Sequence, residues 1–135
     1  MTILLEGKCK VSLNRKRPII SDAWHHNATF RITPNIIKIE YESNKREVRK
    51  KITKIRDYVI YMNNIKKFKI GGNTIIGTLF LTAFEPYITI FHKNNERICL
   101  HGGMFKFTGI QSKIASILEE KITSNMKNKI GNVVD

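Results

Sequence analysis

A dense group of cations between residues 45 and 56 is the strongest chemical feature of this sequence. Seven Lys and Arg residues fall there, behind Asn44 and Glu47, whose spacing predicts a helix N-terminus. Such a face can be merely solvated, but like charges this close repel one another, which indicates an anionic partner. With an earlier basic run, these cations are the expected phosphate or partner contacts: Arg15, Lys16, Arg17, Lys45, Arg46, Arg49, Lys50, Lys51 and Lys54.

A second candidate site comes from residues 77–84, 87–91 and 97–101, which alternate with period two as strands do. One face of these strands is aliphatic. The other face is either an open binding surface or a surface covered by the rest of the chain or by a second subunit. If it is open, the candidate DNA contacts are Asn35, Phe80, Thr82, Phe84, Tyr87, Thr89, Phe91, Arg97 and His101.

Turn residues predict how these strands pair. Glu85-Pro86 is expected to form the first turn and residues 93–95 the second, with Asn95 in the left-handed conformation. The resulting register pairs Ile88 with Leu100 and Ile90 with Ile98.

Helices are expected to cover the aliphatic face. Thr108 and Gln111 have the spacing of a capping box, and apolar residues follow at helical spacing: Ile110, Ile114, Ile117, Leu118 and Ile122. The earlier helix, after Asn44, has the apolar stripe Val48, Ile52 and Ile55.

The remaining segments predict further strands. Residues 2–13 form one, and residues 29–42 form another that Pro34 confines to an edge or a bend. Residues 58–62 and 65–70 are expected to form a hairpin around Asn63-Asn64, followed by a turn at residues 71–73.

No arrangement of residues typical of catalysis or of metal binding is recognisable in the sequence. It has no glycine-rich phosphate loop, no Ser or Cys beside an evident base, and no paired carboxylates. The adjacent residues His25 and His26 have no ligand cluster beside them. Cys9 and Cys99 are expected to be free thiols in a reducing compartment. We therefore expect a protein that is not an enzyme and that has no cofactor or metal.

The overall charge also indicates an anionic partner. The 135 residues carry a net charge of +13, and the first 70 hold 17 basic and 6 acidic residues. Nucleic acid ranks first among the partners this balance favours, an acidic membrane surface second and an acidic protein third. No apolar run reaches membrane-spanning length, and no secretory signal is evident. We therefore expect an intracellular protein that has no membrane partner.

The order of elements resembles one repeat of the TATA-binding protein family. The resemblance rests on NIIKIEY (residues 35–41), LFLTAFEPYITIF (79–91), ERICLHGG (96–103) and the closing helix, and it covers residues 30–122. It implies a half-saddle whose sheet lies on the DNA minor groove, with helices that face partner proteins. Phe80, Phe84 and Phe91 would then insert between base steps, while Thr82 and Thr89 would meet base edges.

We therefore expect an α+β fold, a curved antiparallel sheet with two helices on one face. Residues 1–29 would be a basic extension, 30–122 the domain and 123–135 a polar tail that frays. The expected function is non-catalytic binding of double-stranded DNA in transcription, in the nucleus or at a site of viral transcription. The alternative is a basic assembly subunit of a transcription or RNA–protein complex. The many Ile, Lys and Asn residues suggest an AT-rich genome. A second copy or a similar chain is expected to pair through residues 29–42 and complete the saddle.

Overall fold

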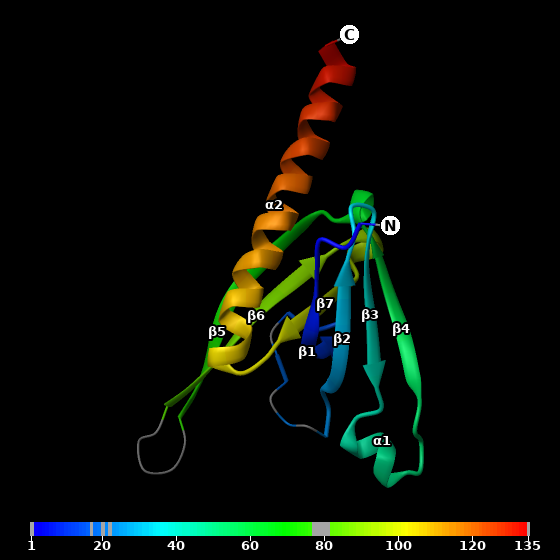
Figure 1. Cartoon of the computed structure of the whole chain (residues 1–135), viewed down its shortest axis with the longest axis vertical. Helices are drawn as coiled ribbons and strands as arrows, with labels where there is room; N and C mark the ends of the chain where they lie inside the picture. Colours follow the sequence, from blue (N-terminus) through cyan, green and yellow to red (C-terminus); the bar gives the residue numbers. More distant parts are fainter. Residues whose placement is uncertain (1, 17, 20, 22, 77–81, 135) are drawn as a thin grey trace.

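The computed structural model describes residues 2–16, 18–19, 21, 23–76 and 82–134. The fold is α+β, with seven antiparallel strands in one sheet and one long helix (Figure 1). The strands are β1 (Leu5–Leu13), β2 (His26–Ile32), β3 (Ile36–Glu42), β4 (Ile55–Tyr61), β5 (Lys67–Ile76), β6 (Thr82–Phe91) and β7 (Arg97–His101). The helices are α1 (Lys45–Arg49), the single 3₁₀ turns η1 (Met62–Asn64) and η3 (Lys93–Asn95), and α2 (Met104–Val134).

The sheet consists of two meanders that β1 joins. Its strand order is β4-β3-β2-β1-β7-β6-β5. β1 pairs with β2 from Leu5 to Val11 and with β7 from Lys10 to Leu13. Figure 1 shows β2, β3 and β4 running along the long axis while β5, β6 and β7 cross them obliquely. The segment expected to be an N-terminal extension thus supplies the middle strand.

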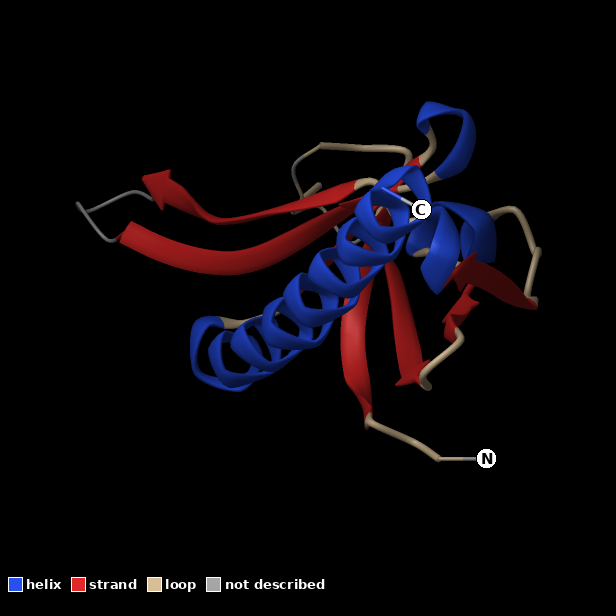
Figure 2. Cartoon of the chain, turned by 90° about the horizontal axis from the view of Figure 1, so that it is seen from above, coloured by secondary structure: helices blue, strands red, loops and turns tan. Residues whose placement is uncertain are grey.

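The core lies between the two meanders and beneath α2. Alternate side chains of each strand face inward, and those with no exposed surface include Ile32, Ile37, Ile39, Ile60, Ile88, Ile90, Ile98 and Leu100. From α2, Ile114 and Leu118 are equally buried. Figure 2 shows α2 lying across the body of the molecule, with β5 and β6 extending beyond it. The prediction that this helix covers the aliphatic face is confirmed.

The β6–β7 hairpin has the predicted register. Ile88 pairs with Leu100 and Ile90 with Ile98. The connection is the 3₁₀ turn of residues 93–95, in which Asn94 and Asn95 both have φ of 59°. Asn tolerates this left-handed conformation better than most residues, so the side-chain alternation and the turn residues specify the same pairing.

The predicted turn at Glu85-Pro86 is wrong, because both residues lie inside β6. Pro86 pairs with Gly72 of β5, and its carbonyl oxygen accepts a hydrogen bond from the Gly102 amide at 3.4 Å. The nitrogen of Pro86 points to the same side as that carbonyl, where β7 has already ended at His101. A proline here breaks no ladder bond, so the strand continues through it.

The predicted turn at residues 71–73 is also wrong, because β5 runs through them. A Cβ atom on Gly71 would lie 2.7 Å from the hydroxyl oxygen of Tyr87 on β6. The glycine therefore gives room to a cross-strand ring. The β5–β6 connection falls in residues 77–81, outside the described residues.

Residues 29–42 form no single strand but most of a hairpin. β2 and β3 pair with Ile32 opposite Ile37, and Pro34 lies in the turn between them. The Thr33 amide donates to the Ile36 carbonyl at 2.9 Å, which closes this turn. Both strands are interior, and the edges of the sheet are β4 and β5. The prediction of a free edge for a second copy in this region is therefore wrong.

The helix predicted after Asn44 is much shorter than expected. Its capping box is confirmed, since Asn44 Oδ1 accepts from the Glu47 amide at 2.9 Å and Glu47 reaches back to the Asn44 amide. The chain leaves the helix at Lys51, whose φ is 62°, and Ile55 already begins β4. The predicted stripe is wrong: Val48, Ile52 and Ile55 are exposed.

The hairpin predicted around Asn63-Asn64 is wrong as well. These residues lie in η1, between β4 and β5 at opposite edges of the sheet. A turn favoured by local residues therefore connects the two meanders and not two paired strands.

α2 begins four residues before the predicted cap, at Met104, and continues through the predicted polar tail to Val134. Gln111 closes no capping box. Its side-chain amide donates to the carbonyl oxygens of Gly71 at 2.9 Å and Tyr87 at 2.7 Å, and so fastens α2 to β5 and β6. The α+β class is confirmed, whereas the half-saddle with two helices on one face is not.

Candidate anion-binding site

The connection between β1 and β2 covers the sheet face that was expected to be open. Thr89 and His101 have no exposed surface. Thr89 donates its hydroxyl hydrogen to the Lys16 carbonyl oxygen at 2.7 Å, and Arg97 donates to the Asn14 carbonyl at 3.3 Å. At Thr89 and His101, cover by the same chain is therefore the right interpretation of this face, and an open binding surface is the wrong one.

The structure places five of the predicted DNA-contact residues on one face of the β6–β7 pair but does not present them as one open surface: Tyr87, Thr89, Phe91, Arg97 and His101. Tyr87, Phe91 and Arg97 are half-buried. Asn35 lies in the β2–β3 turn, where its carbonyl accepts from the Met62 amide. Phe80, the side chains of Thr82 and Phe84, and Arg17 of the phosphate set lie outside the described residues.

A buried polar chain beneath this connection was missed by sequence reasoning. The Ser12 hydroxyl bonds His101 Nε2 at 2.8 Å, and His101 Nδ1 bonds Glu85 Oε1 at 3.3 Å. Ser12 Oγ also accepts from the Ile19 amide at 2.9 Å. Burial lowers the pKa of His101 to about 4, although its bond to Glu85 acts in the opposite direction. A neutral ring satisfies all three bonds if Nδ1–H donates to Glu85 and Nε2 accepts from Ser12.

This polar chain has the order nucleophile, base and carboxylate, which in other proteins can support acyl transfer. Here Ser12 and His101 have no exposed surface, and Ser12 holds the Ile19 amide. We call the Ser12–His101–Glu85 set the latch, because it ties the β1–β2 connection to the sheet. Ser12 and His101 are 89 positions apart in the sequence, so no local motif could have indicated the latch.

A cleft of about 680 Å³ opens beside the latch, between β1, β2, the β1–β2 connection and α1. We call it the cationic cleft. Its cations are Lys10, Lys45 and Arg49, and none of the described residues that line it is Asp or Glu. The other lining residues are Ser21, His25, Asn27, Ser43, Asn44 and Val48. Positive charge and several hydrogen-bonding groups thus converge on one concavity.

Local structure fixes the position of each cation. Lys10 lies opposite Asn27 in the β1–β2 pair, so the two side chains share a face. Lys45 and Arg49 are four residues apart on α1, whose first turn the Asn44 cap stabilises. The Asn44 side chain also donates to the Trp24 carbonyl at 3.3 Å, which fastens α1 to the connection. The cleft is therefore pre-formed without a ligand.

The one carboxylate on α1, that of Glu47, is already paired with a cation. Glu47 forms an ion pair with Arg56, and this hydrogen bond holds the pKa of Glu47 below its usual range. His26 lies 3.6 Å from the same carboxylate. The other cations of α1 and of the loop that follows it are exposed at the end of the molecule where Figure 1 shows α1: Lys45, Arg46, Arg49, Lys50, Lys51 and Lys54. The predicted phosphate contacts of this segment thus share one end of the molecule.

Exposed apolar side chains surround these cations. We call Trp24, Val48, Ile52 and Ile55 the apolar rim; 48% of Trp24, 50% of Val48 and 74% of Ile55 are exposed. Val48 lines the cationic cleft and, with Ile55, a neighbouring hollow. The Arg46 guanidinium lies 4.3 Å from the centre of the Trp24 ring. Large apolar groups exposed beside cations are typical of surfaces that bind a partner.

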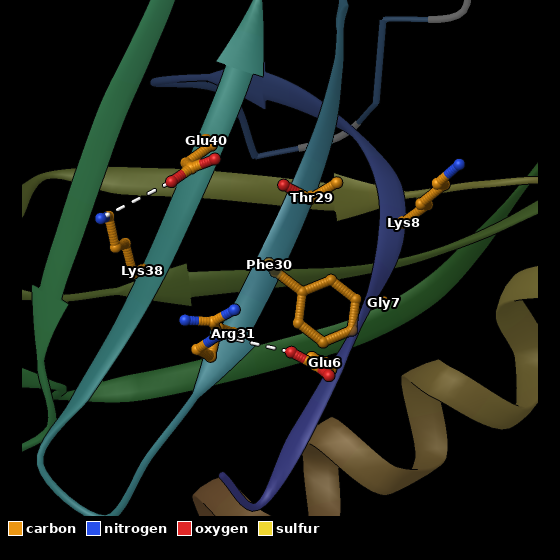
Figure 3. Close-up of a pocket in the computed structure, with 8 residues that line it drawn as sticks. All are labelled: Glu6, Gly7, Lys8, Thr29, Phe30, Arg31, Lys38 and Glu40. Carbon is orange, nitrogen blue, oxygen red and sulfur yellow. Dashed lines mark hydrogen bonds and ion pairs between the residues drawn. The ribbon is translucent and has the colours of Figure 1, made fainter. Parts of the chain in front are cut away.

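A second hollow, of about 330 Å³, lies on the outer face of β1, β2 and β3 (Figure 3). Two of its three cations pair with its own carboxylates: Arg31 Nε lies 3.3 Å from Glu6, and Lys38 Nζ lies 3.6 Å from Glu40. We call it the paired hollow. Because two carboxylates line it, whereas none of the described residues that line the cationic cleft is Asp or Glu, it is the weaker candidate for an anion.

Other kinds of site find no support in the described part of the chain. There, no three His, Cys, Asp or Glu residues are arranged to hold a metal ion, and no helix is long and apolar enough to cross a membrane. His25 bonds the Ile19 carbonyl, and His26 bonds the Glu42 carbonyl. Cys9 and Cys99 are free, and burial raises the pKa of each thiol to about 12.

Comparison with protein-family models, with curated proteins and with solved structures finds no match for this chain. The resemblance to the TATA-binding protein family therefore stays a prediction.

Proposed function

We propose that this protein is a non-catalytic module that docks on an anionic membrane surface by binding lipid phosphate groups in the cationic cleft. The observation that carries the proposal is the convergence of Lys10, Lys45 and Arg49 on one concavity that has an exposed apolar rim. Cations and apolar side chains side by side match the two layers of an anionic bilayer surface, the headgroups and the upper acyl region.

The cations provide the attraction. A basic side chain near an anionic lipid surface contributes about 1 kcal/mol, and Arg49 can hold two phosphate oxygens at once through its planar guanidinium. Because hydrogen bonds already hold α1 and the connection in place, little ordering is needed on binding. A phosphate would also replace the hydration of the cleft with charge-assisted bonds.

The apolar rim favours a membrane over nucleic acid, in contrast to the expectation from the sequence, which ranked nucleic acid first and included no membrane. Trp residues are common at the level of lipid headgroups, and Val48 and Ile55 would leave water on docking. A duplex backbone offers no partner for these side chains. DNA binding as a half-saddle remains the prediction from the sequence, but it relies on a face where Thr89 and His101 are fully buried. The same cations can contact nucleic-acid phosphates, so the test below includes DNA.

Vesicle co-sedimentation tests the proposal. The protein should bind vesicles of phosphatidylcholine mixed with phosphatidylserine, and not vesicles of phosphatidylcholine alone. Lys45→Ala with Arg49→Ala should weaken binding roughly thirtyfold, since two basic side chains contribute about 2 kcal/mol. Lys106→Ala with Lys113→Ala removes the same charge from exposed positions on α2 and serves as the matched control.

A DNA duplex titrated in parallel separates the two kinds of partner. Tighter binding to duplex than to anionic vesicles, with the loss in the α1 variant appearing on duplex, would replace the membrane by nucleic acid. Equal losses in the α1 and α2 variants would show that only total charge matters and would contradict the cleft as the site.

A further inference from the structure

We propose that Glu85 is a built-in competitor that occupies the cleft cation Lys10 until an anionic ligand displaces it. This inference rests on the proposed function, since it concerns the same cleft. Glu85 Oε1 lies 3.6 Å from Lys10 Nζ, and 9% of the Glu85 side chain and 39% of the Lys10 side chain are exposed. The carboxylate comes from β6, while the ammonium group lines the cleft from β1.

The buried position of Glu85 favours its ion pair with Lys10. A carboxylate this buried needs compensating donors, and the same oxygen accepts from His101 Nδ1 at 3.3 Å. If Lys10 turns toward a ligand, the neutral His101 is the one donor left to that oxygen among the described residues. The pull of Glu85 on Lys10 therefore opposes every anion that enters the cleft.

This opposition selects among ligands. A singly charged group gains little by taking Lys10 from a carboxylate of equal charge. A phosphate monoester or pyrophosphate carries more charge and more acceptor oxygens, so it can outweigh Glu85. The cleft should therefore prefer densely charged phosphate groups over carboxylates or single phosphodiesters.

Replacement of Glu85 with Gln gives a clean test because the amide oxygen can still accept from His101. With pyrophosphate as the probe in isothermal titration calorimetry, Glu85→Gln should raise affinity about twofold to fivefold, the range expected for a partly exposed ion pair. Glu6→Gln removes the same charge at the far end of β1, four residues or about 13 Å from Lys10, and should change affinity little.

A double-mutant cycle assigns the gain to Lys10. In a Lys10→Gln background, Glu85→Gln should give no further gain, because the competitor has lost its target. Acetate, titrated against both proteins, should gain from Glu85→Gln by no larger a factor than pyrophosphate, because the cost of freeing Lys10 is the same for every ligand. A gain no greater than that of Glu6→Gln, or one that persists without Lys10, would overturn the proposal.

An NMR measurement on the wild-type protein tests the proposal without any variant. On saturation with pyrophosphate, the ¹³C resonance of the Glu85 carboxylate should shift as Lys10 leaves it, while that of Glu6 stays in place. A Glu85 resonance that does not move contradicts the competitor. If the wild-type protein binds neither pyrophosphate nor anionic vesicles, the proposed function itself fails.

Discussion

The cationic cleft and the paired hollow share the same two strands and yet differ in what they can bind. Lys8 opposite Thr29 belongs to the paired hollow, and Lys10 opposite Asn27, two residues further along β1, belongs to the cationic cleft. Around the hollow, carboxylates on β1 and β3 pair with Arg31 and Lys38. Around the cleft, α1 adds Lys45 and Arg49, and its one carboxylate, Glu47, pairs with Arg56. Glu85 pairs with Lys10 but does not line the cleft. A binding site thus depends less on how many cations are present than on where their carboxylate partners lie.

The largest expected effect is on stability, and it comes from a substitution in the core that supports both sites. Ile114 has no exposed surface, so Ile114→Ala should lower the free energy of unfolding by about 2 to 5 kcal/mol. Thermal unfolding followed by circular dichroism measures the loss. Vesicle affinity at a temperature where the variant stays folded should be unchanged, because Ile114 lies on α2 and does not line the cleft. An unchanged melting temperature would show that α2 does not stabilise the sheet.

The buried His101 of the latch should make the free energy of unfolding depend on pH. In the unfolded chain His101 takes a proton near pH 6.5, whereas burial lowers its pKa to about 4 in the folded protein. Stability should therefore be complete above pH 6.5 and fall as the pH drops from 6.5 toward 4. The fall should be about 1 to 2 kcal/mol by pH 5.

His101→Asn should flatten this dependence, as measured by urea unfolding at several pH values. Burial also lowers the pKa of His92, so a smaller fall in the same direction should remain. His92→Asn is the matched control, because it leaves the latch in place. An equally steep fall without His101 would contradict the neutral ring in the latch.

A carboxylate among the residues that line the cleft should make it behave like the hollow. Asn27→Asp places a negative charge opposite Lys10, and it should weaken binding to anionic vesicles about fivefold to tenfold. Thr29→Asp adds the same charge to the paired hollow, two residues away on an exposed position of β2, and should cost less than twofold by the same reasoning. Equal losses would remove the distinction between the two sites.

The parts of the fold that the sequence predicted are those where local signals act alone. The alternation of residues 87–91 and 97–101 specified the β6–β7 register, and Asn44 with Glu47 specified the start of α1. Long-range pairing overrode local signals elsewhere. Gly71 and Gly72 favour a turn, but pairing with β6 and the ring of Tyr87 keep them in a strand.

The candidate site was predictable only in part for the same reason. The α1 cations were predicted as phosphate contacts, and they do gather at one end of the molecule. Lys10 was not, because only the fold brings it beside Lys45 and Arg49. The β1–β2 connection has no periodicity that could reveal which face it covers, so the burial of Thr89 and His101 could not be foreseen.

Lys10→Ala and Lys8→Ala test the central claim most directly, because the two variants remove one positive charge each from the same strand. Their affinities for vesicles of phosphatidylcholine mixed with phosphatidic acid, a lipid phosphate monoester, should be compared at low and at physiological salt. We expect Lys10→Ala to weaken binding about fivefold, in line with about 1 kcal/mol for one basic side chain, and to weaken its salt dependence. Lys8→Ala should stay within about twofold of the wild-type protein. Equal effects of the two substitutions, or no effect of Lys10→Ala, would contradict the cationic cleft as the anion-binding site.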